Sequence, residues 1–90
     1  MFNKPQRGAN MAIKILRLPS TLDRTGNGRS THYQHIANGL WPPPVRIGSR
    51  SVGWPEHECE AVIAARIGGK SDDEIRFLVT SLVAARSKIA

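Results

Sequence analysis

A short run in the first half of the chain concentrates side chains that can bind an anionic, hydrogen-bonding partner. Its members are Arg29, Ser30, Thr31, Tyr33 and Gln34. Arginine and glutamine can each make two parallel hydrogen bonds to a planar edge, and hydroxyl groups suit single oxygen atoms. A second group follows further along the chain and comprises Arg46, Arg50 and Ser51. These residue types are the ones that contact base edges and phosphate oxygens.

The excess of positive over negative charge is confined to one part of the sequence. The net charge is +6; residues 1–57 contain eight basic and two acidic side chains, whereas residues 58–90 contain five of each. A basic segment joined to a balanced one indicates a surface for a polyanion more than a generally basic protein.

Length and composition set further limits. Ninety residues indicate one domain, and the single cysteine, Cys59, excludes an intramolecular disulfide, which fits a reducing cytoplasm. No apolar run reaches the roughly 18 residues of a membrane span, and residues 1–10 lack the apolar core of a secretory signal. We expect a cytoplasmic, nucleoid-associated protein without membrane contact. Residues 1–12 are expected to form a flexible tail, in which Met11 offers an alternative start.

Two short helices around a glycine turn are expected to carry the first group of polar side chains. Residues 13–18 alternate as a brief strand, and Pro19 begins a helix to about Thr25 with Leu22 facing inward. Gly26, Asn27 and Gly28 then form a sharp turn, and a helix over 29–38 is capped by Gly39. Helix, tight turn and helix make the helix-turn-helix pattern.

The second polar group lies on a predicted β-hairpin. Residues 41–44, Trp-Pro-Pro-Pro, are interpreted as a rigid connector in preference to a proline-rich ligand motif. Strands over 45–47 and 52–54 flank a turn at 48–51, so that Arg46 and Arg50 lie near its tip. We expect Trp41 and Trp54 in the core, where they hold the hairpin against the helices.

Two amphipathic helices complete the chain. The first runs from Pro55 to about Ile67, and its apolar stripe comprises Cys59, Val62, Ile63 and Ile67. Ser71 and Glu74 have the spacing of a capping box for the second, and Arg86 and Lys88 suit the negative end of its dipole. The apolar stripe of this last helix comprises Ile75, Leu78, Val79, Leu82 and Val83. It packs either on the preceding helix or on a second subunit, as a homodimer through the C-terminal helix.

Residues 15–67 resemble the AlpA family of phage regulatory proteins, small relatives of MerR-type and excisionase-type winged helices. The matching segments are 16–18, 25–26, 29–31 with Tyr33, Gly39 with Pro42, 44–48, 50–52, Trp54, Glu56, Glu60 and 64–66. The resemblance implies a helix-turn-helix followed by a small wing, DNA binding, and regulation of transcription or excision in an integrated element.

Three features depart from that family pattern. Asn27 replaces an apolar turn residue, Gly28 replaces a side-chain cap, and His32 and His35 occupy inward positions that are usually aliphatic. His32, His35 and Ile36 together form one face of the helix. Either this helix packs less well, or the histidines are recruited outward.

The sequence thus predicts an α+β, mainly helical fold: a tail (1–12), a winged helix-turn-helix domain (13–67) and a C-terminal amphipathic helix (70–90). We expect Arg29 and Gln34 to contact bases, Ser30, Thr31 and Tyr33 to contact phosphates, and the hairpin, with Arg46, Arg50 and Ser51, to lie on the backbone or in the minor groove. Alternatives are a solvated Arg29, a half-buried core Tyr33 and a Gln34 that only supports the helix.

The expected function is sequence-specific binding of double-stranded DNA by a transcriptional regulator, with RNA polymerase or a recombinase as a further partner. Alternatives are an excisionase-like factor that bends DNA and an interaction adaptor with a degenerate helix-turn-helix. No enzyme, cofactor or metal is expected, because the phosphate-binding glycine loop and paired carboxylates are missing. His32, His35, His57 and Cys59 lack the spacing of a structural zinc site.

Overall fold

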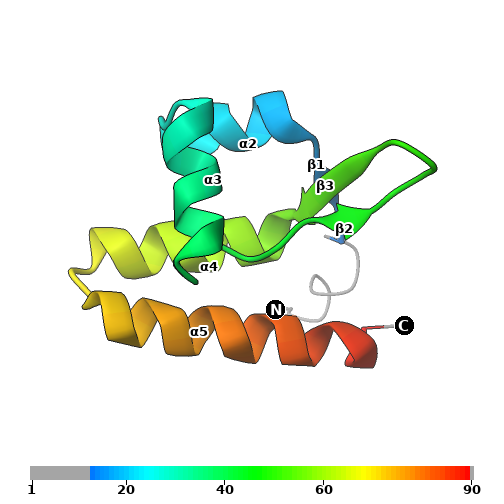
Figure 1. Ribbon diagram of the computed structural model, residues 1–90. Helices are drawn as coiled ribbons and strands as arrows, with labels where there is room; N and C mark the ends of the chain where they lie inside the picture. The colour runs from blue at the N-terminus through cyan, green and yellow to red at the C-terminus, as the bar shows by residue number, and fades with distance from the viewer. Residues whose placement is uncertain (1–12, 90) are drawn as a thin grey trace, which may run out of the picture.

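The computed structural model describes residues 13–89, and their elements follow the expected order (Figure 1). The elements are β1 (Ile15–Leu16), α2 (Leu18–Thr25), α3 (Arg29–Ala37), β2 (Val45–Arg46), β3 (Val52–Pro55), α4 (Glu56–Ile67), α5 (Asp72–Ala85) and the 3₁₀ turn η1 (Arg86–Lys88). The predicted α+β, mainly helical architecture is confirmed. The predicted tail, residues 1–12, falls outside the described residues.

Helices α2 and α3 form the predicted pair around a glycine turn. Pro19 lies in the first turn of α2, which ends at Gly26, and the Asn27 amide donates to Thr25 Oγ1 at 3.1 Å. The fully buried side chain of α2 is Thr21, whose hydroxyl donates to the Arg17 carbonyl, whereas Leu22 is only partly buried. The expectation that Leu22 provides the inward face is therefore met only in part.

The end of α3 is fixed by a Schellman motif. The Leu40 amide donates to the His35 carbonyl at 2.8 Å, and the Gly39 amide donates to the Ile36 carbonyl at 3.2 Å. Gly39 has a φ of 77°, a left-handed conformation that glycine adopts at little cost. The predicted glycine cap is confirmed, and it turns the chain into the connector, residues 38–44.

A three-stranded antiparallel sheet with strand order β1-β3-β2 carries the predicted hairpin. Val45 pairs with Gly53 and Arg46 with Val52, and we call β2, β3 and the turn between them the wing. Pairing of β1 with β3 was not expected from the sequence. It brings Leu16 opposite Trp54, and the backbones approach so closely that a Cβ at Gly53 would lie 2.7 Å from the Leu16 carbonyl oxygen.

Both tryptophans lie in the core, as predicted. The buried apolar side chains come from β1, the connector, β3, α4 and α5: Leu16, Leu40, Trp41, Trp54, Cys59, Val62, Ile75 and Val79. The Trp54 indole donates to the Pro42 carbonyl at 2.9 Å, which attaches the connector to the wing. Ile67 is 81% exposed, so its assignment to the buried stripe is wrong, because α4 ends there and the chain reverses direction.

Helix α5 lies along α4 (Figure 1). Its capping box is confirmed, because Ser71 Oγ accepts from the Glu74 amide and the Glu74 carboxylate accepts from the Ser71 amide. Ile75 and Val79 are buried, and Leu78, Leu82 and Val83 are partly buried against the core. The stripe therefore packs within the chain, but only in part, so dimerisation through the C-terminal helix stays a prediction.

Within residues 13–89, no helix is long and apolar enough to cross a membrane.

Candidate nucleic-acid interface

The N-terminus of α3 is open to an anionic partner. Gly28 is its N-cap residue and supplies no side-chain hydrogen bond to the first turn. The first amides of any helix lack intrahelical acceptors, and together with the helix dipole they favour an anion. Arg29, Ser30 and Thr31 surround this end and are all exposed.

Two further predicted site residues are accessible one turn along α3. Gln34 is exposed, and Tyr33 is 47% exposed while its ring packs edge-on against the His32 ring, with centroids 5.0 Å apart. Tyr33 is thus a surface aromatic supported on one side by the core. All five predicted α3 side chains are accessible to a partner.

The wing presents its predicted residues at the opposite end of the connector. The Ser51 carbonyl accepts from the amides of Ile47 and Gly48 at 2.8 and 3.3 Å, which closes the turn. Arg46 and Arg50 are exposed, and Ser51 is partly buried. The backbone of Ser51 therefore has a structural role in addition to any contact by its hydroxyl.

The arginines divide into two groups by their ionic partners. Four of them pair with carboxylates of the fold: Arg24, Arg66, Arg76 and Arg86. Within residues 13–89, Arg29, Arg46 and Arg50 have no carboxylate within 4.0 Å, and all three are exposed. Positive charge that the fold does not neutralise is therefore present at α3 and at the wing.

Arg17 shares these properties, although the sequence analysis did not select it. It is the N-cap residue of α2, is exposed, and makes no ion pair with the described residues. Its position just before the first helix of a helix-turn-helix is the sequence feature that could have marked it as a candidate contact residue.

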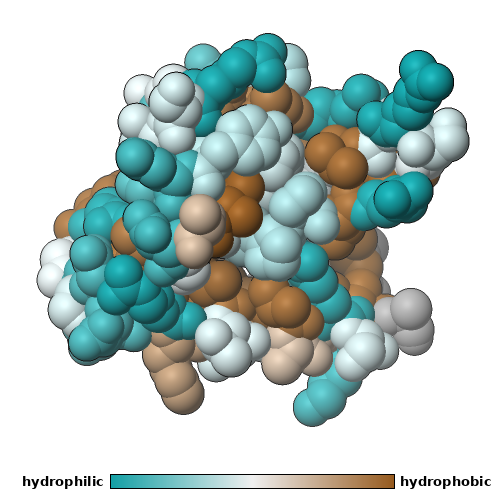
Figure 2. Space-filling model, in the orientation of Figure 1, coloured by the Kyte–Doolittle hydropathy of each residue, from teal (hydrophilic) through white to brown (hydrophobic). Residues whose placement is uncertain are grey.

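Helix α3 and the wing are both seen on the face shown in Figures 1 and 2. Hydrophilic side chains cover the end of α3 nearest to α2 and also project from the wing (Figure 2). A partner that approaches this face can meet both elements.

His32 is a core residue. It is 1% exposed and lies edge-on to Trp54, with ring centroids 4.7 Å apart, and to Trp41 at 6.1 Å. Burial lowers the pKa of its imidazole, with a smaller contribution from His35. The possibility that this histidine is recruited outward is therefore wrong: the neutral ring substitutes for an aliphatic side chain among the aromatic rings.

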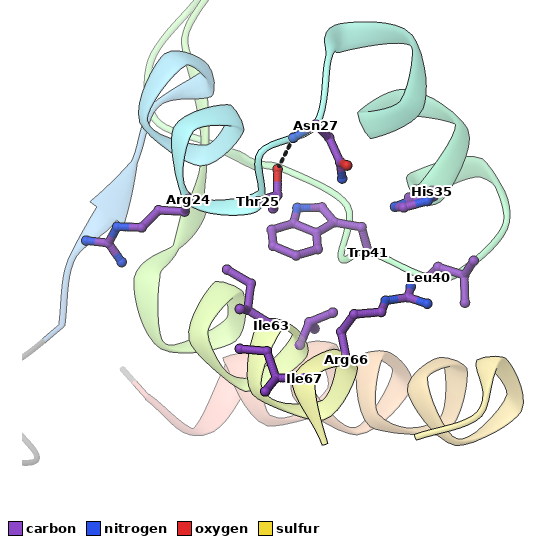
Figure 3. Close-up of a pocket in the computed structure, with 10 residues that line it drawn as sticks. Arg24, Thr25, Asn27, His35, Leu40, Trp41, Ile63, Arg66 and Ile67 are labelled. Atoms are coloured by element: carbon purple, nitrogen blue, oxygen red, sulfur yellow. Dashed lines mark hydrogen bonds between the residues drawn. The ribbon is translucent and has the colours of Figure 1, made fainter. Parts of the chain in front are cut away.

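His35 faces a different region from the exposed α3 side chains. It lines a cavity of about 530 Å³ between the helix-turn-helix and α4, together with Asn27, Trp41, Ile63 and Arg66 (Figure 3). None of the eight predicted DNA-contact side chains lines this cavity. Among residues 13–89, no three His, Cys, Asp or Glu side chains are grouped as metal ligands.

A helix-turn-helix followed by a β-hairpin defines a winged helix-turn-helix fold. The chain belongs to the Prophage CP4-57 regulatory protein (AlpA) family, whose family model matches residues 14–67. The resemblance drawn from the sequence is confirmed, and α5 lies beyond the matched segment.

Two relatives show how far the similarity extends. An uncharacterized protein, ORF88, of Enterobacteria phage P4 is 39% identical over 57 residues, which cover 63% of this chain and 65% of the phage protein. The DNA-binding transcriptional activator AlpA of Escherichia coli (strain K12) is 33% identical over 61 residues, covering 61% of this chain and 87% of the activator. The chain thus matches just under two thirds of the length of the phage protein. No solved structure matches significantly.

Proposed function

We propose that this chain is a sequence-specific transcriptional regulator of a phage or integrated element that binds double-stranded DNA. In this proposal α3 enters the major groove, and the wing lies on the adjacent backbone or in the minor groove. One observation carries the proposal: among residues 13–89, Arg29, Arg46 and Arg50 are exposed and have no carboxylate partner, whereas four other arginines are paired within the fold. Phosphates are the partners that such a surface suits.

Side chains at the start of α3 are assigned roles by their chemistry. Arg29 can bridge two acceptors of guanine, and Gln34 can do the same for adenine, each with about 1–3 kcal/mol of discrimination. Ser30, Thr31 and Tyr33 donate to phosphate oxygens and fix the position of the helix. The open N-terminus of α3 adds its amides to these contacts.

The wing supplies the second set of contacts. Arg46 and Arg50 bind the phosphate backbone or enter the minor groove, where the negative potential attracts arginine. Ser51 contributes a hydroxyl at the base of the turn, and Arg17 contacts a phosphate next to α2.

Regulation of transcription is the favoured role because a relative is a transcriptional activator. The protein would then act in the cytoplasm at the nucleoid, with RNA polymerase as its further partner. A footprint over a promoter supports this role. Protection of an attachment site with strong bending would instead indicate an excisionase-like role with a recombinase partner.

Selection of duplexes from a random pool tests the proposal. We expect an enriched motif, and gel shifts on that motif should weaken steeply as salt rises, because binding releases counterions from DNA. A motif with two-fold symmetry would indicate a dimer, for which the partly buried side chains of α5 are one candidate surface. No enrichment, with no salt-dependent shift, would contradict DNA binding and favour an interaction adaptor.

A further inference from the structure

The connector between α3 and the wing is held by side chains from the C-terminal part of the chain. Arg76 Nε in α5 donates to the Asn38 carbonyl at 2.8 Å, at the point where α3 ends. Arg86 in η1 donates to the Pro43 carbonyl at 2.8 Å, two residues before β2 begins. The connector is therefore bound near each of its ends by an arginine.

Arg86 is itself rigidly placed. Its Nε and a terminal nitrogen donate to the two oxygens of Glu58 at 2.8 and 2.7 Å, and Glu58 is fully buried in α4. A bidentate arginine–carboxylate pair restricts the orientation of the guanidinium. The same terminal nitrogen reaches Pro43, so that α4, η1 and the connector meet at one group.

Arg76 is placed by packing at the other end. A Cβ built on Gly39 would lie 3.5 Å from Arg76 Cγ, so the arginine stem lies against the turn that ends α3. Asp73 accepts a hydrogen bond from its guanidinium at 3.1 Å. The ten residues from Arg76 to Arg86 correspond to about 15 Å of helix, which keeps the two anchors well apart.

We propose that Arg76 and Arg86 are positioning residues, through which the C-terminal part of the chain fixes the wing relative to α3. The consequence for DNA binding rests on the proposed function, whereas the effect on geometry does not. Both arginines lie outside the segment that matches the family, residues 14–67. The wing-to-helix spacing is thus set by a part of this chain that the family match does not include.

Distances between spin labels test the geometry without DNA. Labels at Ser30→Cys in α3 and Val52→Cys in β3 report the spacing, since both native side chains are exposed. Cys59 does not interfere, because its side chain is fully buried. We expect a narrow distance distribution in the parent and in Arg76→Lys, and a broader or shifted one in Arg76→Met, which keeps the stem but loses the donor.

Lys88→Met is the matched control, because it removes one charge from the same C-terminal segment and Lys88 is exposed. Arg86→Met alone leaves the buried Glu58 carboxylate unpaired and can unfold the chain. The double variant Arg86→Met with Glu58→Met removes both charges, and we expect it to fold and to show the broadened distribution. Identical distributions in parent, Arg76→Met and the folded double variant would overturn the proposal.

Measurements of DNA binding distinguish the positioning role of Arg76 and Arg86 from the proposed function. On the selected duplex and a scrambled duplex, Arg76→Met should reduce the ratio of the two affinities about threefold or more, with Lys88→Met unchanged. Broadened distances with an unaltered ratio would overturn the consequence for DNA. Broadened distances in a protein that binds no duplex at all would support the positioning role and contradict the proposed function.

Discussion

Arg29 occupies the first position of α3, exposed and without a carboxylate partner among residues 13–89. Replacing it by alanine should weaken binding to the selected DNA by about 1–3 kcal/mol and relax the preference at one base position. Competition gel shifts against single-base variants of the site would measure both effects, with Lys88→Ala as a control for loss of one charge. A uniform loss over all sequences would show that Arg29 contacts only phosphate.

His32 makes the stability of the fold depend on pH. Burial lowers the imidazole pKa in the folded state below its usual value near 6.5, so the unfolded chain binds this proton more readily. The contribution of His32 to stability is constant above pH 6.5 and is lost as the pH falls from there toward the lower folded-state pKa, because only the unfolded chain takes up the proton in that range. Urea titrations between pH 7.5 and pH 5 would measure the dependence of stability on pH in wild type and in variants.

His32→Leu, which replaces the buried imidazole by an aliphatic side chain, should flatten the dependence of stability on pH. His57→Gln is the control, because it removes an exposed histidine. This substitution should leave the dependence of stability on pH unchanged. Equal slopes in wild type and His32→Leu would show that this buried ring does not carry the pH dependence.

Pairing of β1 with β3 connects the start of the helix-turn-helix to the wing. At Gly53 an added Cβ would lie 2.5 Å from Ile15 Cγ2 and 2.7 Å from the Leu16 carbonyl oxygen, and a backbone atom cannot move aside. Gly53→Ala should therefore lower the free energy of unfolding by about 1–3 kcal/mol, as overpacking does. At Gly48 an added Cβ would meet one heavy atom of residues 13–89 within 4 Å, Ser51 Cβ at 4.0 Å. Gly48→Ala should therefore change the free energy of unfolding by less than about 0.5 kcal/mol.

Thermal and chemical denaturation of the two alanine variants would measure the difference. If both variants unfold like the parent, the strands do not approach as closely as the structure shows. The comparison is sharp because the two glycines lie in the same hairpin and the substitutions are identical.

Elements with a local signal in the sequence were predictable. The capping box of α5, the Gly39 cap of α3 and the hairpin around residues 48–51 each depend on neighbours within a few residues. Pairing of β1 with β3 joins segments nearly forty residues apart, at Leu16 and Trp54, and no short-range pattern encodes it. Ile67 fits the helical spacing but lies at the end of α4, where spacing alone does not report where packing stops.

Most of the candidate interface could be proposed from residue type, since arginine, glutamine and hydroxyl side chains suit base edges and phosphate oxygens. The ionic partners of the other arginines could not be predicted from the sequence. Arg86 suited the helix dipole, yet it pairs with Glu58, 28 residues away. Arg86 has a carboxylate partner and Arg29 has none among residues 13–89. This difference depends on tertiary structure, which composition and charge balance do not predict.

At the scale of the whole molecule, the ion pair between Arg86 and the buried Glu58 joins η1 to α4. Arg86→Met should lower the free energy of unfolding by about 3–5 kcal/mol, because the Glu58 carboxylate remains buried without a partner. Arg66→Met, which breaks the exposed pair with Asp72, should cost less than about 1 kcal/mol. Guanidinium unfolding curves of both variants would measure these values, and comparable losses would mean that the buried pair is no more important than a surface one.

Salt dependence of DNA binding tests most directly whether the wing is part of one cationic face with α3. The double variant Arg46→Ala with Arg50→Ala and the control Lys70→Ala with Lys88→Ala each remove two positive charges from exposed positions. We expect the slope of log affinity against log salt to become shallower by about 2 in the wing variant, from two lost phosphate contacts, and to stay at the wild-type value in the control. An unaltered slope in the wing variant, or equal changes in both, would contradict the proposed interface.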